Sequence, residues 1–321
     1  GDAAVWFASF STQPYSVIPY HVIVVAGTLL TLFLGAHSIE KTNKVMMPLF
    51  YVMFIYMAVR VAMMPGASEG YKYLFILPDA KHLLNPETWI FALGQAFFSL
   101  SVGIGTMVTY ASYFKPDTNL RHTALNVSLL DTLVAVLAGV IIFPAVFTAG
   151  IAPTSGPSLV FITLPGIFNG MPLSMVWSTV FFLLLVVAAI TSTISLHEVI
   201  TAYLHEEWHL SRRAAAWLTT GATALLATLA SLSLGVLGGW RIFGLTLFDA
   251  LDFATANILL PLGGLFTCLF VGWKLDPARL HDEVTNGGEL RFRIYGLFIF
   301  LLRWVCPIIL LLVFLDNLGL Y

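Results

Sequence analysis

The chain has 321 residues, of which 59% are hydrophobic and only 10% are charged, and its mean hydropathy is +0.90. Soluble domains carry about 25% charged residues, so this composition excludes a soluble globular protein and indicates a membrane protein. Fifteen Lys and Arg residues against seventeen Asp and Glu residues give a net charge of −2, which excludes the basic excess typical of nucleic-acid binding. The two cysteines, Cys268 and Cys306, both lie in apolar runs, which predicts neither a disulfide framework nor a cysteine-based metal site.

Eight segments are long and apolar enough to cross a bilayer, which takes about 20 mainly apolar residues. In chain order they are 17–36, 45–64, 88–114, 123–149, 173–204, 213–236, 245–273 and 292–319. None of them alternates apolar and polar residues as the strands of a membrane barrel do. The sequence therefore predicts an all-α polytopic membrane protein, a single transmembrane domain over 1–321 with about eight transmembrane helices.

Basic residues in the short loops predict the orientation, because Lys and Arg are enriched on the cytoplasmic side. The loops of one side hold Lys41, Lys44, Lys115, Arg121, Arg212, Arg213, Lys274, Arg279, Arg291 and Arg293, and those of the other side hold Lys72, Lys81 and Arg241. Ten against three places the first set in the cytoplasm and both chain ends outside, so that 1–16 is an extracellular lead-in. This lead-in contains no signal peptide that would carry it across the membrane, and we therefore expect an N-terminal piece to be missing.

The outer segment 150–172 is rich in Pro and Gly and carries no charge. Its short apolar run, 159–164, is too short to span a membrane. We expect either a lid that dips toward the membrane surface or a plain connector.

The span 88–114 contains two serines and two glycines close together, namely Ser99, Ser101, Gly103 and Gly105. Glycine costs a helix roughly 1 kcal/mol relative to alanine, so this composition predicts a break at 99–105. Unwound backbone at this depth is tolerated where protein or a wet cavity covers it, and its free groups then bind a small ion and an anionic group, as in transporters. The alternative is that the small residues merely allow a neighbouring helix to pack closely.

Asp131 lies about a third of the way into the span 123–149. A bare carboxylate is costly there, so we expect it to mark a site and to have a cation or a proton as its partner. In the span 173–204, Thr191 and Ser192 offer hydroxyl oxygens, which suit a hard cation such as sodium. Hydroxyls in membrane helices also commonly bond back to their own backbone, and that alternative stays open.

His197 and Glu198 lie near the cytoplasmic end of the same span. We expect them to form a polar contact between helices, which we favour over a proton relay.

The stretch His205-Glu206-Glu207-Trp208-His209 matches H-E-x-x-H, whose helical spacing places two imidazoles on one face for zinc. Catalytic zinc needs a third protein ligand, and the sequence shows no obvious one.

The stretch 94–105, followed by Thr109-Tyr110-Ala111-Ser112-Tyr113, resembles the neurotransmitter:sodium symporter family in its bacterial branch. Further agreement follows in order at 39–48, 131–144, 161–165, 191–192 and 257–264, so the resemblance covers essentially the whole chain. It implies a partial inverted-repeat symporter fold that lacks counterparts of helices one to three. In this scheme 17–64 holds the last two helices of the first repeat, 88–273 the second five-helix repeat and 292–319 an additional C-terminal helix.

The resemblance further implies symport, by alternating access, of sodium ions and an amino acid or related small amine, in the bacterial plasma membrane and without enzymatic activity. Ser99 and Asp131 would belong to the first sodium site. The second would use the Ala188 carbonyl with the Thr191 and Ser192 hydroxyls. The substrate pocket would be lined by Phe98, Ser99, Ser101, Ile104, Ser192 and Leu196. The gating residues would be Asp252 on the outside and Tyr113 and Glu206 on the inside.

The family's gate arginines and the rest of both sodium sites belong to the first helix, which has no counterpart in this sequence. A second function therefore stays open, a membrane scaffold or receptor fragment that keeps the fold without transporting. An intramembrane zinc protease is the third alternative.

Overall fold

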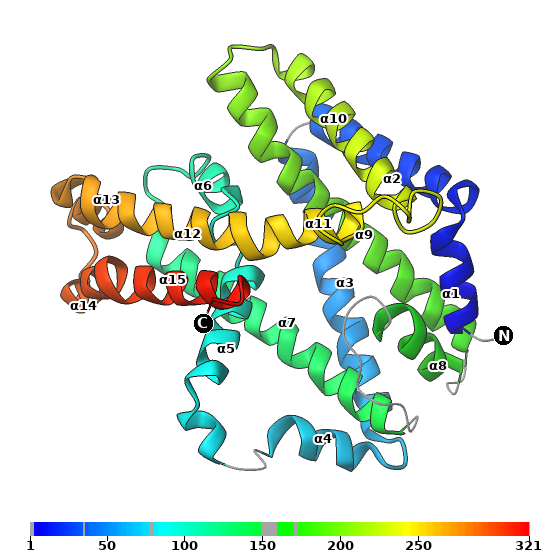
Figure 1. Cartoon of the computed structure of the whole chain (residues 1–321). Coiled ribbons are helices and arrows are strands. Elements are labelled where there is room, and N and C mark those ends of the chain that lie inside the picture. The colour runs from blue at the N-terminus through cyan, green and yellow to red at the C-terminus, as the bar shows by residue number, and fades with distance from the viewer. Residues whose placement is uncertain (1–2, 35, 77–79, 149–158, 170–172, 321) are drawn as a thin grey trace. The chain divides into compact units, whose positions relative to one another are not determined.

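The computed structural model describes residues 3–34, 36–76, 80–148, 159–169 and 173–320. Within this part the regular secondary structure is helical, and extended pairing is limited to the isolated bridge between Ile242 and Leu245. The chain folds into two compact units (Figure 1). The first comprises Gly1–Pro78 and Val134–Phe248, and the second comprises Asp79–Leu133 and Asp249–Tyr321. The structure thus has the all-α architecture that the sequence predicts.

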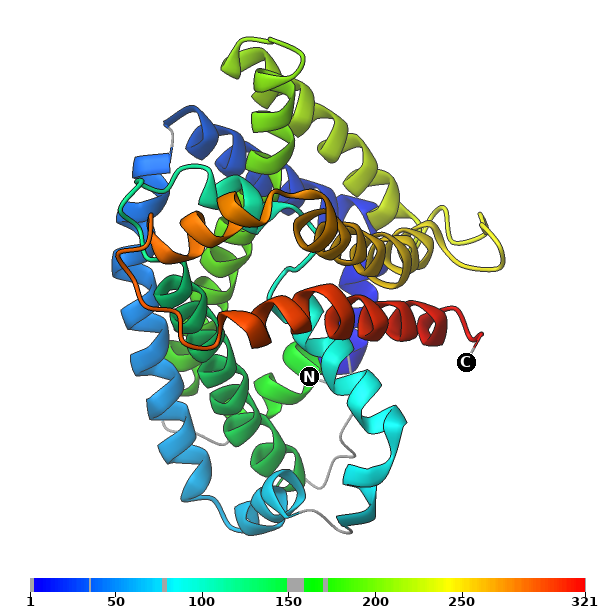
Figure 2. The ribbon, with the colours of Figure 1, turned by 90° about the vertical axis from the view of Figure 1, so that its left-hand side faces the viewer.

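The first unit is built from long apolar helices and several short ones. They are α1 (Ala3–Thr12), α2 (Pro14–Leu34), α3 (Ala36–Ala62), α4 (Ala67–Phe75), the later part of α7 (Leu120–Thr148), η2 (Leu159–Thr163), α8 (Leu164–Asn169), α9 (Ser174–Glu206) and α10 (Arg212–Leu232). The helices α9 and α10 form an antiparallel hairpin, and α2 packs against both of them (Figure 1, Figure 2). Ser211 caps the start of α10, where its hydroxyl accepts a hydrogen bond from the Ala214 amide at 3.2 Å.

The second unit holds the broken span and the C-terminal helices. They are η1 (Ala80–Leu84), α5 (Pro86–Ser99), α6 (Thr106–Ala111), the first part of α7, α11 (Leu247–Phe253), η3 (Ala254–Leu259), α12 (Leu260–Leu269), η4 (Phe270–Lys274), α13 (Pro277–Thr285), α14 (Tyr295–Phe300), η5 (Leu301–Val305) and α15 (Cys306–Asn317). The segments η3, η4 and η5 are π-helical turns inside longer helices. Asn85 caps α5 and is followed by a proline at the first helical position.

Five helices of the described part are long and apolar enough to cross a membrane. They are Leu120–Thr148, Ser174–Glu206, Arg212–Leu232, Leu247–Lys274 and Tyr295–Asn317. Each corresponds to a span that hydropathy predicts. The three other predicted spans differ in form: 17–36 contains the shorter apolar helix Tyr15–Leu30, 45–64 belongs to a helix pair bent by 115°, and 88–114 is split into α5 and α6.

The bent pair consists of α3 and α4, and α4 is an element that hydropathy missed because it is short and amphipathic. Its Gly70 contacts the backbone of Pro144 in α7 so closely that a methyl group at this position would overlap it. One turn further along α4, the Leu74 side chain reaches Gly139, where an added methyl would lie 3.4 Å from it. Glycines on both helices therefore permit this close packing.

The core of the first unit lies where α3, α7, α8 and α9 meet. Its fully buried members are Met53, Met57, Val61, Ile141, Ala145, Leu164, Phe168 and Phe181. The Phe168 and Phe181 rings pack with their centroids 5.4 Å apart. The outer segment 150–172, expected to be a lid or a connector, lies in part outside the described residues; its described part, 159–169, forms η2 and α8.

Candidate functional site

The predicted break in the third span is present in the structure. The helix α5 ends at Ser99 and α6 begins at Thr106. Between them the backbone takes left-handed conformations at Ser101 (φ 54°), Gly103 (φ 93°) and Gly105 (φ 88°), which no right-handed helix contains. Glycine adopts these angles without steric cost, and two of the three left-handed positions are glycines. The prediction of a break at 99–105 is confirmed.

The unwound segment is covered by α12 of the same unit. A methyl group on Gly103 would collide with the Leu260 carbonyl oxygen, and one on Gly263 would collide with the Gly103 carbonyl oxygen. The two backbones therefore touch directly, which only glycine at both positions allows. Non-helical backbone at membrane depth requires such a protein cover. The two expected alternatives, a broken helix and close packing through small residues, thus occur together.

Ser99 and Asp131 meet at the point where α5 ends. The Ser99 hydroxyl lies 2.8 Å from Asp131 Oδ1 and 2.7 Å from Oδ2, and both side chains are half-buried. The chain separates them by 32 residues, so α7 has to pack beside the break to bring them together. A hydroxyl and a carboxylate are hard oxygen ligands, which suit a hard monovalent or divalent cation. The donor set therefore fits the sodium ion that the resemblance implies.

The other proposed sodium ligands lie on one stretch of α9, in the first unit. The Thr191 hydroxyl donates to the Ala188 carbonyl oxygen at 2.8 Å, which brings two of the three expected oxygens together. The hydroxyls of Thr193 and Ser195 bond back to the carbonyls of Ala189 and Thr191 in the same way. These back-bonds match the structural alternative, and Ser192 is the exposed hydroxyl of the run. The assignment of Ala188, Thr191 and Ser192 to a sodium site stays a prediction.

The proposed substrate-lining residues fall into two groups. Phe98, Ser101 and Ile104 lie at or beside the break, and Phe98 and Ile104 are 55% and 37% exposed. Ser192 and Leu196 are one turn apart on α9, and both are exposed. Exposed apolar side chains next to an unwound segment are available to a ligand, but their assignment to a pocket stays a prediction.

The structure also indicates two features that sequence reasoning missed. Thr106, the first residue of α6, buries its hydroxyl without a hydrogen-bond partner among the described residues. Phe98 lines a cavity of about 220 Å³ together with Gln95, Asn257 and Asp316. A polar residue inside a broken membrane helix is the sequence feature that could have singled out Thr106. The cavity could not be anticipated, because its walls come from segments that are far apart in the sequence, namely α5, η3 with the adjoining α12, and α15.

The three proposed gating residues, Tyr113, Glu206 and Asp252, are all exposed. Tyr113 follows α6, Glu206 is the last residue of α9, and Asp252 lies in α11. Exposure at helix ends agrees with groups that open and close at an aqueous surface. Their roles stay predictions.

The zinc-binding alternative requires a helix from His205 to His209. The helix α9 ends at Glu206, and His209 is left-handed with φ 53°. The His205 ring bonds the Leu210 carbonyl at 2.7 Å, and the described part of the chain contains no group of three His, Cys, Asp or Glu residues placed to hold a metal. The two imidazoles do not share a helical face, so the spacing argument for zinc fails.

Glu198 takes part in a helix–helix contact, as expected, whereas its neighbour His197 bonds within its own helix. Its carboxylate is 4% exposed and accepts hydrogen bonds from the Arg212 guanidinium at 2.8 Å to each oxygen. Its neighbour His197 is also buried and bonds the Thr193 carbonyl through Nδ1 at 2.8 Å.

In the second unit the intramembrane Arg303 pairs with a backbone group, since its Nε donates to the Gly272 carbonyl oxygen.

The chain is similar to bacterial proteins that are named as sodium-dependent transporters. An uncharacterized sodium-dependent transporter of Bacillus subtilis is 35% identical over 314 residues, which cover 98% of this chain and 69% of that protein. An uncharacterized sodium-dependent transporter of Haemophilus influenzae is 37% identical over 316 residues, which cover 95% of this chain and 66% of that protein. This chain therefore spans about two thirds of the length of these relatives.

A solved structure has the same fold. The crystal structure of MhsT in complex with L-phenylalanine matches with a TM-score of 0.89 at 38% identity, over 98% of this chain and 71% of that one. The model of the sodium:neurotransmitter symporter family matches residues 15–321. The break between α5 and α6, the packing of α12 against it and the long apolar helices agree with this match. This chain therefore belongs to the sodium:neurotransmitter symporter family, a family of multi-pass membrane transporters.

Proposed function

We propose that this chain forms the larger part of a sodium-driven amino-acid symporter. In the full polypeptide it joins the third of the relatives' length that has no counterpart here. The transporter moves its substrate by alternating access around the break between α5 and α6, and it catalyses no bond cleavage or group transfer. Bacterial relatives support a location in a bacterial plasma membrane.

One observation carries this proposal, the pairing of Ser99 with Asp131 at the end of α5. Ionised carboxylates inside a membrane are costly unless a partner offsets their charge. The Ser99 hydroxyl donates a single hydrogen and leaves the negative charge in place. A sodium ion at these oxygens would supply the missing positive charge and form the first sodium site.

The proposed roles of the remaining residues follow the resemblance. Ala188, Thr191 and Ser192 contribute to a second sodium site. Phe98, Ser99, Ser101, Ile104, Ser192 and Leu196 line the substrate pocket, and Tyr113, Glu206 and Asp252 gate it. The apolar members Phe98, Ile104 and Leu196 favour a substrate with an apolar side chain. The similar MhsT was solved with L-phenylalanine, so phenylalanine is the first substrate to test.

The test is uptake of radiolabelled phenylalanine into liposomes that contain the full gene product, including all sequence upstream of Gly1. We expect uptake when an inward sodium gradient is imposed and none when potassium replaces sodium. The variant Asp131→Ala should abolish sodium-dependent uptake, because it removes the charged ligand. Full sodium dependence in Asp131→Ala would refute the assignment of this residue, and a folded protein without uptake of any amino acid would favour the scaffold alternative.

A further inference from the structure

Two helices of the second unit lie antiparallel and in close contact, α12 with its extension η4 and α15 with its preceding turn η5 (Figure 1, Figure 2). Two glycines fix their register. A methyl group built on Gly264 would lie 3.4 Å from the Leu310 side chain, and one built on Gly272 would lie 3.5 Å from the Arg303 Cα atom. Residues further along α12 therefore contact residues earlier in the η5–α15 helix, as antiparallel packing requires.

This register places the two cysteines of the chain opposite each other. Cys268 lies one turn beyond Gly264 on α12, and Cys306 lies one turn before Leu310 on α15. The register therefore brings the two side chains next to each other across the contact of α12 with α15, and both thiols are free. Cys268 is 8% exposed, and Cys306 is half-buried. The sequence gives no sign of this juxtaposition, because each apolar run read alone does not show how one packs on the other.

The helix spacing at this point suits a covalent link. Gly264, Cys268 and Gly272 follow one another at four-residue intervals, and small residues at this spacing let membrane helices approach closely. A disulfide needs its Cβ atoms roughly 3.5–4.5 Å apart. The Gly272 contact reaches the Arg303 backbone and the Gly264 contact reaches the Leu310 side chain, so the two helices lie close together on both sides of Cys268.

We propose that Cys268 and Cys306 form an intramembrane redox-modification site, at which a lipid-soluble quinone oxidises the two thiols to a disulfide that ties α12 to α15. The two S–H bonds break and one S–S bond forms. The two protons and two electrons pass to the quinone, which leaves as the hydroquinone. The disulfide carries no charge, so the low-dielectric surroundings do not oppose its formation, whereas a metal dithiolate with net charge would be costly there.

The link would act close to the broken helix. On α12, Gly264 lies one turn from Cys268 and also faces the Val102 side chain, 3.7 Å from an added methyl group. The adjacent Gly263 touches the Gly103 backbone. Fixing α12 to α15 therefore restrains the cover of the unwound segment, and we expect the oxidised protein to transport more slowly.

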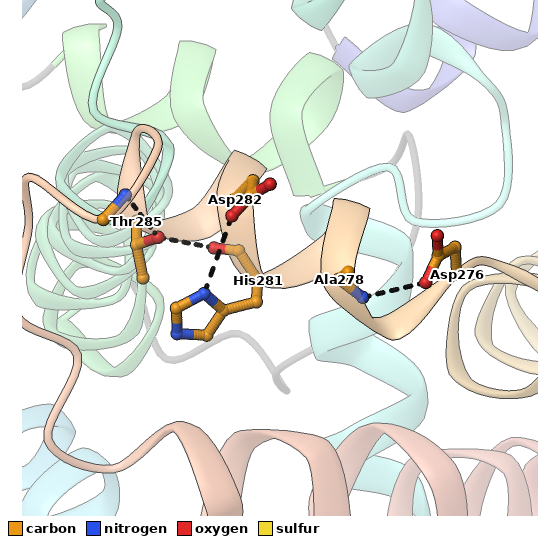
Figure 3. Close-up of polar contacts among 6 residues, drawn as sticks. Asp276, Ala278, His281, Asp282 and Thr285 are labelled. Carbon is orange, nitrogen blue, oxygen red and sulfur yellow. Dashed lines mark hydrogen bonds and ion pairs between the residues drawn. The ribbon is translucent and has the colours of Figure 1, made fainter.

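The connection between the cysteines provides a sharp assay. It contains α13, which is held by its own capping bonds: Asp276 accepts from the Ala278 amide at 3.0 Å, and the Thr285 hydroxyl donates to the His281 carbonyl at 2.6 Å (Figure 3). Beyond it, Gly287 and Gly288 have positive φ and open space around them. A site for a specific protease inserted between these glycines can be cut without disturbing either cysteine helix.

The full gene product with this insertion is reconstituted in liposomes, exposed to a lipid-soluble benzoquinone and then cut. We expect the two fragments to migrate together on a gel without reductant and to separate with dithiothreitol, and the linked peptide to lack two hydrogen atoms by mass spectrometry. Cys268→Ser and Cys306→Ser should separate under both conditions. Separation of the oxidised parent protein without reductant, or a linked band in either serine variant, would overturn the proposal.

A second measurement tests the consequence for transport. Oxidised parent protein should take up substrate several-fold more slowly than reduced protein, with recovery after dithiothreitol, while both serine variants should be insensitive to the quinone. A disulfide that forms without any change in uptake would overturn the restraint on the broken helix. If no uptake occurs even in reduced protein, the gel assay still decides the modification site, so its failure is distinct from failure of the transport proposal.

Discussion

Individual side chains at the break decide whether this site can hold a cation. Ser99 is the one residue that both ends α5 and contacts Asp131, with its hydroxyl close to both carboxylate oxygens. A hydrogen bond to a charged group contributes about 1.5–3 kcal/mol, more than a bond between neutral groups. The hydroxyl therefore orients the carboxylate as well as offering an oxygen of its own.

We predict that Ser99→Ala will raise the sodium concentration needed for half-maximal uptake by about tenfold, which corresponds to about 1.4 kcal/mol. The matched variant Ser99→Thr keeps the hydroxyl and should stay much closer to the parent protein. Uptake by the full gene product, measured over a series of sodium concentrations, checks this. Equal sodium dependence in all three proteins would rule out a role for this hydroxyl.

Gly103 is the residue at which the break depends most strictly on the absence of a side chain. Its φ of 93° is unfavourable for any other residue, and a methyl group would overlap the backbone of α12.

We predict that Gly103→Ala will lower stability by at least about 1–3 kcal/mol, seen as a lower thermal midpoint of the purified protein in detergent. Gly296→Ala in α14 is the control, because its added methyl meets nothing within 4 Å and its backbone is helical. A thermal midpoint of Gly103→Ala as high as that of Gly296→Ala would show that the contact with α12 does not form.

At the scale of helices, the hairpin of α9 and α10 is joined by a buried charge pair. Glu198 is almost fully enclosed, while Arg212, at the first turn of α10, is partly exposed. Removing the arginine takes away the positive charge that faces the buried carboxylate, and the resulting loss is far larger than the net stabilisation that the pair provides.

We predict that Arg212→Ala will destabilise the protein by about 3 kcal/mol and lower its thermal midpoint. Arg213→Ala removes the same charge from the next, exposed residue and should have little effect. Introducing Glu198→Gln into Arg212→Ala should recover part of the loss, since the remaining group is then neutral. No recovery in the double variant would contradict the buried-charge explanation.

On the scale of the whole molecule, binding of sodium and substrate should be linked to folding. A ligand that binds only the folded state stabilises it by about 2.7 kcal/mol when its concentration is 100 times its dissociation constant. This effect is independent of transport.

We predict that sodium together with phenylalanine will raise the thermal midpoint of the full gene product and that potassium with phenylalanine will not. The increase should disappear in Asp131→Ala. A midpoint that responds equally to both cations would indicate a general salt effect and would contradict a specific sodium site. Thermal unfolding followed by tryptophan fluorescence gives the measurement.

The sequence by itself determined the properties that depend on local composition. Hydropathy predicted the long membrane helices, such as 123–149 for α7, which the structure places at Leu120–Thr148. Two glycines and two serines predicted the break that the structure shows between Ser99 and Thr106. Both follow from residue type alone, because span length and helix propensity are properties of neighbours in the chain.

Only the tertiary structure decided which residues meet. The bond from Ser99 to Asp131 follows from the resemblance but not from either span alone. The contact of Gly103 with Gly263 and the placement of Cys268 opposite Cys306 follow from neither the resemblance nor a single span. Nor did hydropathy find α4, whose place depends on the glycine contact with α7. The physical reason is that contacts between helices depend on their register and rotation, which are set by packing across the whole unit and leave no local pattern in the sequence.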